Sequence, residues 1–187
     1  MSDNLFLYNI LGHIECIKSL TEKVKSISHK EWGSWVDRKV FIDQQDSNTI
    51  PVFNLPDREN RVFKNKIYNV KINNLLEEEL QECYNRIEEY YPGEPKRVLL
   101  VSLSAGCNVQ AHTDCGYHLE TCRRVHVPII TNNKVLFLCN GVQVPMAAGS
   151  LVDFNNNVQH EVINRSLQDR IHLIIDWGKK NDAYYME

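Results

Sequence analysis

Residues 97–177 contain eight short apolar runs, which are VLLVSLS (98–104), VQAH (109–112), RRVHVPII (123–130), KVLFLC (134–139), VQVP (142–145), SLVDF (150–154), VQHEVI (158–163) and RIHLIIDW (170–177). Clusters of Gly, Asn and Asp separate these runs, as turn residues separate β-strands. Many short strands at close spacing are typical of a β-sandwich or a β-barrel. The sequence therefore predicts a mainly β fold for this region.

The part of the chain before residue 97 carries two amphipathic helical patterns and two shorter strand-like runs. Apolar residues recur at steps of three or four at Ile14, Ile17, Leu20, Val24 and Ile27, and again at Leu76, Leu80, Cys83, Ile87 and Tyr91. The second pattern starts beside three glutamates and stops at Pro92, which fits the helix dipole and a helix end. The strand-like runs span residues 39–42 and 50–53. Residues 1–96 are thus expected to supply helices and accessory strands beside a β core at residues 97–178.

The length and charge of the chain limit the number of domains it can contain and the kinds of partner it can bind. Its 187 residues suffice for one domain with a sizeable core and are few for two, so residues 1–187 are treated as a single domain. A net charge of −3 gives no broad basic footprint, which disfavours nucleic acid or an anionic membrane surface as a partner. No membrane span or signal peptide is recognisable, so we expect a cytoplasmic protein. The six cysteines lack a CxxC pair, which favours reduced thiols over a zinc site or a disulfide framework.

Three residues form a candidate metal site. His112 and Asp114 lie two positions apart at the end of a predicted strand, so their side chains point to the same face. His160 lies in another predicted strand much later in the chain. Two histidines and one carboxylate can occupy one face of an iron ion and leave three positions open. Each of these residues alone is more simply an ordinary hydrogen-bonded side chain, so the hypothesis depends on the three together.

Arg170 adds a second feature to this candidate site. It opens the run RIHLIIDW, in which strand alternation puts Arg170, His172, Ile174 and Asp176 on one face. A guanidinium that points into a pocket needs an anion, and its planar fork suits a carboxylate. A surface arginine at the start of a strand is the alternative interpretation.

Five motifs resemble the aspartyl/asparaginyl β-hydroxylase family when they are taken in order, and they are HTD (112–114), RRVHVPI (123–129), GSLVDF (149–154), QHEVIN (159–164) and RIHLIIDW (170–177). The resemblance runs from about Val98 to Trp177. It implies a double-stranded β-helix, the cupin-like jelly roll, with flanking N-terminal helices. It also implies a dioxygenase that uses Fe(II), 2-oxoglutarate and O₂ to hydroxylate its substrate, with release of succinate and CO₂.

The same resemblance implies a role for each candidate residue. The three residues of the candidate metal site would bind Fe(II), and Arg170 would hold the distal carboxylate of 2-oxoglutarate with help from Ser102. Arg124 and His126, which strand alternation places on one face, would lie near the iron-chelating end of the co-substrate. A buried histidine paired with a main-chain carbonyl is the alternative for His126, and an ordinary strand hydroxyl is the alternative for Ser102.

Asp114 separates this chain from some animal members of the family, which lack the carboxylate ligand. The complete triad also disfavours a halogenase, because a halide would need the position that this carboxylate fills. Those animal members carry a membrane anchor and a helical-repeat domain, which we do not expect in a chain of this length. The substrate of those animal members is therefore not assigned to this chain.

The substrate is expected to be an amino-acid side chain in a protein, a peptide or a free amino acid. Loops supply most contacts in such scaffolds, so the candidate pocket walls are the loop from Cys115 to Cys122 and the region of Trp32, Trp35 and Phe41. Two other functions stay open. Arg170 argues against a cupin-type metal enzyme that works without 2-oxoglutarate, and the intact triad argues against a non-catalytic cupin-like binding module.

Overall fold

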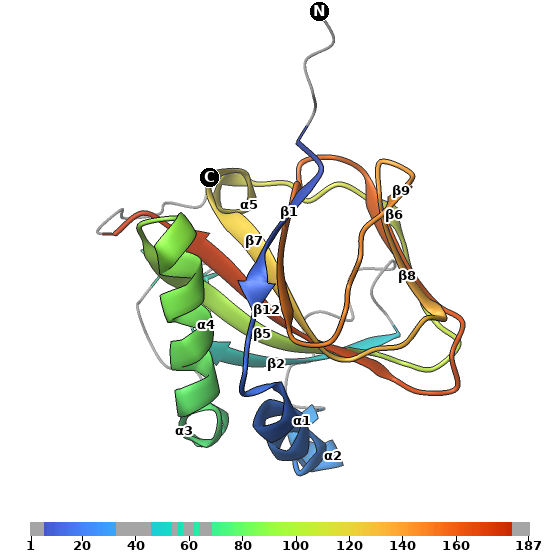
Figure 1. Cartoon of the computed structure of the whole chain (residues 1–187), viewed down its shortest axis with the longest axis horizontal. Coiled ribbons are helices and arrows are strands. Elements are labelled where there is room, and N and C mark those ends of the chain that lie inside the picture. The colour runs from blue at the N-terminus through green and yellow to red at the C-terminus, as the bar shows by residue number, and fades with distance from the viewer. Residues whose placement is uncertain (1–5, 33–45, 54–55, 58–61, 64–68, 181–187) are drawn as a thin grey trace, which may run out of the picture.

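Two antiparallel sheets that face each other form the centre of the computed structural model, which describes residues 6–32, 46–53, 56–57, 62–63 and 69–180. The helices α1 and α4 lie on the outer side of the larger sheet, and the smaller sheet lies across from it (Figure 1). This arrangement is a jelly roll. It confirms the predicted mainly β fold with flanking N-terminal helices.

The larger sheet has six strands in the order β1-β10-β7-β12-β5-β2. Their bounds are β1 Tyr8–His13, β10 Ser150–Phe154, β7 Arg123–Ile130, β12 Arg170–Gly178, β5 Glu94–Leu103 and β2 Ser47–Phe53. Strand β12 lies between β7 and β5, and all of its residues are buried, as expected for a strand that is covered on both faces. Its inward face is therefore a rigid wall behind the site.

The smaller sheet has four strands in the order β6-β11-β8-β9. Their bounds are β6 Asn108–His112, β11 His160–Asn164, β8 Val135–Cys139 and β9 Val142–Gln143. Strands β6 and β11 pair so that His112 and His160 are direct cross-strand partners. Two short strands, β3 Pro56–Asp57 and β4 Val62–Phe63, pair with each other in a separate sheet.

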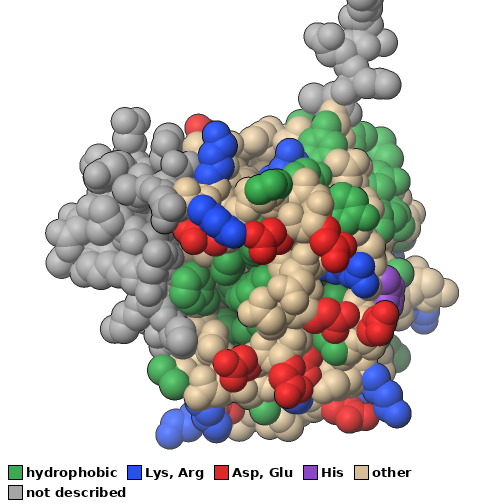
Figure 2. Space-filling model, turned by 60° about the vertical axis from the view of Figure 1, so that its left-hand side comes forward, with side chains coloured by type: hydrophobic (Ala, Val, Ile, Leu, Met, Phe, Trp, Pro, Cys, Tyr) green, Lys and Arg blue, Asp and Glu red, His purple; other side chains and the backbone are tan. Residues whose placement is uncertain are grey.

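The helices bury the outer face of the larger sheet. They are α1 Ile17–Lys25, α2 His29–Trp32, α3 Val70–Leu75 and α4 Glu77–Tyr90; the fifth helix, α5 Tyr117–Thr121, contributes no residue to the apolar cluster on that face. Leu20 of α1 and Leu80 of α4 share an apolar cluster with Leu100 of β5 and Leu173 of β12. Acidic and basic side chains are interspersed on the side of the molecule that carries α4 (Figure 2), in keeping with the small net charge. Among the helices described, none is long and apolar enough to cross a membrane.

All eight strands predicted in residues 97–177 are present, as β5 to β12. The second predicted helix is confirmed as α4, but α1 starts at Ile17 and not at Ile14, because the main chain at Ile14 still bonds to Gly149 beside the pairing of β1 with β10. Strand β1 was not predicted. The run at 50–53 belongs to β2, an edge strand of the larger sheet, and the run at 39–42 lies outside the described residues.

Candidate metal centre

The candidate site is a cavity of about 50 Å³ between the two sheets. Six of the seven predicted site residues line it, and they are His112, Asp114, Arg124, His126, His160 and Arg170. Most of the remaining wall is apolar and includes Phe137, Val162 and Ile174. The cavity thus combines a polar cluster with surroundings that favour exclusion of water.

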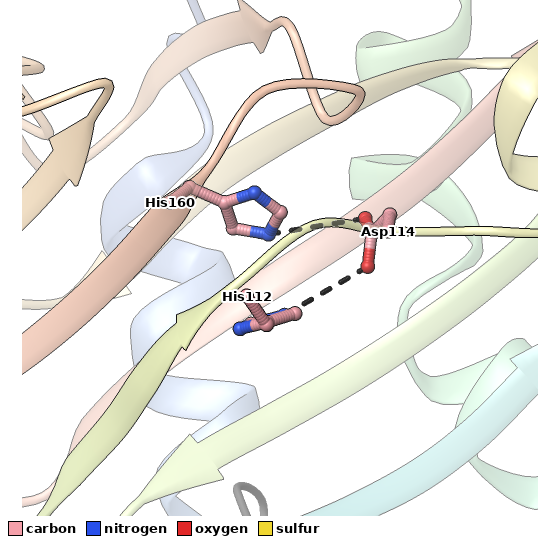
Figure 3. Close-up of side chains that lie close together, drawn as sticks. All are labelled: His112, Asp114 and His160. Atoms are coloured by element: carbon pink, nitrogen blue, oxygen red, sulfur yellow. Dashed lines mark ion pairs between the residues drawn. The ribbon is translucent and has the colours of Figure 1, made fainter.

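The three predicted metal ligands converge on one point. His112 ends β6, Asp114 follows two residues later, and His160 begins β11. Nε2 of His112 lies 3.8 Å from Oδ1 of Asp114, and Nε2 of His160 lies 4.0 Å from Oδ2 of Asp114. Both imidazoles turn toward the carboxylate (Figure 3). These separations exceed hydrogen-bond length, and donor atoms of all three residues lie within 4.8 Å of one another. The three groups therefore surround a space that one cation can fill.

Main-chain carbonyls orient the rings of both histidines. Nδ1 of His112 donates to the carbonyl of Gln110 at 2.7 Å, and Nδ1 of His160 donates to the carbonyl of Val158 at 2.9 Å. Because a carbonyl only accepts, Nδ1 carries a proton in each ring, so the neutral form of each ring keeps its lone pair on Nε2. Burial also lowers the pKa of His160, which favours the neutral ring that a metal needs.

A buried ion-pair network lies behind Asp114. Arg124 on β7 donates through Nη1 to Oδ2 of Asp114 at 2.6 Å, and through Nε and Nη2 to Asp176 on β12 at 2.8 and 3.2 Å. Asp176 also accepts from Arg97 at 2.6 Å and lies 3.0 Å from Nε2 of His118. Burial opposes ionisation of Asp176, but Arg124 and Arg97 outweigh burial and hold the pKa of Asp176 well below its usual range. A charged carboxylate thus supports the arginine that contacts Asp114.

Arg170 is part of a second buried cluster, at the start of β12. Its Nη2 donates to Nδ1 of His172 at 2.6 Å, and the same Nδ1 lies 3.3 Å from Nδ1 of His126. Because a guanidinium only donates, Nδ1 of His172 is an acceptor, and Nδ1 of His126 is assigned the proton. Nε2 of His126 is then an unprotonated acceptor, and within the described part of the chain it has no hydrogen-bond partner. A buried polar atom of this kind in a cavity wall fits a site that receives a polar ligand.

Acid should destabilise the metal-free protein partly through His172. Burial and the charge of Arg170 lower the pKa of His172 well below 6.5, so only the unfolded chain takes up this proton as the pH falls below about 6.5. Stability is therefore complete above that pH and is lost below it, by up to about 1.4 kcal/mol per pH unit for each such histidine. His118, His126 and His160 act in the same direction.

Urea unfolding between about pH 7 and pH 5 measures this effect. The free energy of unfolding of His172→Asn should fall less steeply with decreasing pH than that of the wild type, by the contribution of one proton. Equal slopes for the two proteins would show that His172 is not held in its neutral form by the fold.

The structure does not bring Ser102 to the cavity. Ser102 on β5 is in register with Ile171 on β12, and Ile171 belongs to the apolar cluster under the helices. Its neighbours Val101 and Leu103 point the opposite way and line the cavity. The serine in the cavity wall is Ser47 of β2, which is in register with Leu103.

The sequence analysis gave no role to His172 or Asp176, although strand alternation correctly put both on the face of Arg170.

The predicted pocket walls that the structure describes do not line the cavity. Trp32 packs against the apolar cluster on the outer side of the larger sheet, while Trp35 and Phe41 lie outside the described residues. The loop from 115 to 122 forms α5, which contributes no residue to the described cavity wall. All six cysteines of the chain are free thiols.

Several solved structures share this fold. A Trichoplax adhaerens prolyl hydroxylase, in complex with a peptide fragment of the hypoxia inducible factor oxygen degradation domain, has a TM-score of 0.59 and 13% identity over 95% of this chain and 86% of its own. A Pseudomonas putida prolyl-4-hydroxylase has a TM-score of 0.53 and 13% identity over 94% of each chain. The non-heme alpha ketoglutarate dependent epimerase SnoN from nogalamycin biosynthesis has a TM-score of 0.64 and 11% identity over 96% of this chain and 80% of its own. At these identities the likeness establishes the double-stranded β-helix fold and nothing further.

Comparison of the sequence with known proteins identifies its family. No curated protein matches the chain. The family described as Aspartyl/Asparaginyl beta-hydroxylase matches residues 52–180, a range that includes all strands from β5 to β12 and every predicted site residue. The match spans more than half of the sequence, and the chain therefore belongs to the aspartyl/asparaginyl beta-hydroxylase family.

Proposed function

We propose that this protein is an Fe(II)- and 2-oxoglutarate-dependent dioxygenase that hydroxylates an amino-acid side chain, in a protein, a peptide or a free amino acid, and releases succinate and CO₂. One observation carries the proposal. Two imidazoles and a carboxylate surround one point in a cavity whose wall also contains the buried guanidinium of Arg170. A metal and a carboxylate co-substrate that binds it need these two features in one cavity.

The donor set suits Fe(II). His112, Asp114 and His160 would hold the ion through three protein donors and leave its other coordination positions open. When bound, iron and 2-oxoglutarate supply the oxidative chemistry, in which decarboxylation of the co-substrate is coupled to oxidation of a substrate C–H bond. The chain itself fixes the geometry. Hydrogen bonds from Nδ1 of both histidines hold the rings, and Arg124 holds the carboxylate.

Arg170 would bind the distal carboxylate of 2-oxoglutarate with its planar fork. His172 orients the guanidinium by accepting a hydrogen bond from Nη2. Because burial and Arg170 itself lower the pKa of His172, this partner is neutral and does not offset the positive charge. The apolar side chains of Phe137 and Ile174 in the cavity wall lower the local dielectric constant, which strengthens the attraction between Arg170 and a carboxylate.

The substrate class is proposed from the family and from one structural relative. The name of the family refers to aspartyl and asparaginyl residues. The Trichoplax adhaerens enzyme was solved in complex with a peptide fragment. SnoN is an epimerase on the same fold, so the fold alone does not determine the reaction. Hydroxylation of an amino-acid side chain is the outcome that the family favours.

Two alternative functions make different predictions. A cupin-type metal enzyme that works without 2-oxoglutarate would use the triad, but it would not need a buried Arg170 in the cavity wall. A non-catalytic cupin-like binding module would need neither feature. Binding of 2-oxoglutarate to the metal therefore separates the proposal from both alternatives.

Anaerobic titration of the Fe(II)-loaded protein with 2-oxoglutarate tests the proposal. A weak visible charge-transfer band is expected as the co-substrate chelates the metal. On addition of O₂ with a panel of free amino acids and cell-extract peptides, mass spectrometry should detect the gain of one oxygen atom together with succinate release. Folded protein that binds Fe(II) but shows neither the band nor succinate would favour the metal enzyme without 2-oxoglutarate.

A further inference from the structure

Asp176 lies at the centre of the buried network behind the metal site, yet it does not line the cavity. Its side chain is 1% exposed. It meets Arg124 of β7, Arg97 of β5 and His118 of α5, so three segments of the chain converge on one carboxylate. Burial of a charged carboxylate costs free energy of desolvation, which these three contacts offset.

The two-pronged contact with Asp176 determines the direction of the Arg124 side chain. Asp176 accepts from Nε and Nη2 of Arg124, and this leaves Nη1 to donate to Oδ2 of Asp114 at 2.6 Å. Asp114 Oδ2 is thereby held by a charge-assisted hydrogen bond. Oδ1 lies 3.8 Å from Nε2 of His112, and Oδ2 lies 4.0 Å from Nε2 of His160. Arg124 thereby fixes the orientation of the Asp114 carboxylate between the two imidazoles.

The sheet holds this arrangement rigidly. Asp176 is the direct cross-strand partner of Arg124 on one side and of Arg97 on the other. Side chains at such positions are neighbours by virtue of strand pairing itself. Asp114 is also held from its main chain, since its N–H donates to the carbonyl of Asn156. Asn156 in turn donates to the carbonyl of Leu119 in α5.

Charge gives Asp176 a second effect on the site. The guanidinium of Arg124 contacts the carboxylate that would bind a divalent cation, and unopposed it would repel that cation in a medium of low dielectric constant. Asp176 offsets this charge. The two arginines and two aspartates of the network sum to zero, so the network itself adds no net positive charge beside a bound divalent cation.

We infer that Asp176 is a positioning residue of the metal centre, which acts through Arg124 to hold the carboxylate of Asp114 in its orientation toward the metal and to neutralise the arginine beside it. The inference deepens the proposed function, because it rests on the assignment of Asp114 as a ligand. It concerns metal binding alone, so it can be tested without turnover.

The test compares two buried aspartates by Mn(II) titration, in which loss of the free-ion EPR signal reports binding. Asp153 provides a matched control, because its side chain is also 1% exposed and accepts a hydrogen bond from an arginine, Arg123, at 2.9 Å. Asp176→Asn should lower Mn(II) affinity by about 10- to 100-fold, the range for loss of an outer partner of a metal ligand. Asp153→Asn should bind Mn(II) as the wild type does. Equal affinities for the two variants would overturn the inference.

Arg124→Lys provides a second test if Asp176→Asn does not fold, as judged by circular dichroism. Lysine keeps the charge, but its single ammonium replaces the three nitrogens with which Arg124 reaches Asp176 and Asp114, so the two-pronged contact with Asp176 is lost. Its Mn(II) affinity should fall as in Asp176→Asn, and wild-type affinity would overturn the inference. A wild-type protein that binds no Mn(II) would overturn both the ligand assignment and the inference. A wild-type protein that binds Mn(II) but makes no succinate with Fe(II) would refute the proposed function alone.

Discussion

Replacement of His160 by alanine should abolish succinate formation and weaken Mn(II) binding by more than the roughly 10- to 100-fold that loss of an outer partner costs. His160 would supply one of three protein donors, and the hydrogen bond from its Nδ1 to Val158 orients the ring so that Nε2 lies toward Asp114. The same loss is expected for His112→Ala and Asp114→Ala, since each also removes a donor. Mn(II) titration and succinate release from the Fe(II)-loaded protein measure the two effects separately.

Glu161→Ala is the matched control for this prediction. Glu161 follows His160 on β11 and is in register with Leu138, but strand alternation points its side chain to the opposite face. Its removal should leave metal binding and turnover unchanged. Circular dichroism establishes that each variant is folded. A His160→Ala protein that binds Mn(II) as tightly as Glu161→Ala would show that His160 is not a ligand.

The metal triad could be proposed from sequence because its residue types and order are specific, but its geometry could not. His112 and His160 meet because β6 and β11 are paired with these two residues as direct partners. Pairing between strands so distant in the chain depends on the whole sheet, and a shift of one residue would turn His160 to the other face. Local alternation shows which residues share a face and does not show which strand lies beside it.

Ser102 illustrates a limit of alternation on a central strand. The run VLLVSLS is apolar on both faces, because β5 is covered by helices on one side and by the smaller sheet on the other. The pattern therefore does not show which side faces the cavity. The structure gives that side to Leu103, the direct partner of Arg170, and Ser102 faces the helices.

Asp176 shows the opposite case, in which the face was predicted and the partners were not. Alternation in RIHLIIDW placed Asp176 on the same face of the strand as Arg170. Its ion pairs with Arg97 and Arg124 exist only because β12 lies between β5 and β7. Strand order of this kind follows from the packing of the complete fold, and so the support behind Asp114 was visible only in three dimensions.

Arg170→Ala should weaken 2-oxoglutarate binding by about 2–5 kcal/mol, or roughly 30- to 4,000-fold, the range for truncating one partner of a buried charge pair. Arg170 is 3% exposed and lines the cavity that holds the triad, so the carboxylate it binds would lose its partner in a medium of low dielectric constant. Mn(II) affinity should barely change, because Arg170 is not among the metal donors. The measurement is 2-oxoglutarate titration of the anaerobic Fe(II) complex.

Two further variants separate the charge of Arg170 from its shape and from the net charge of the protein. Arg170→Lys should recover part of the lost affinity, since the charge is kept and the fork is not. Arg123→Ala changes the net charge equally, but Arg123 pairs with Asp153 and does not line the cavity, so its affinity should match the wild type. If Arg170→Ala and Arg123→Ala bind 2-oxoglutarate equally well, the buried guanidinium does not hold the co-substrate. The triad would then fit a metal enzyme that works without 2-oxoglutarate better than it fits a dioxygenase.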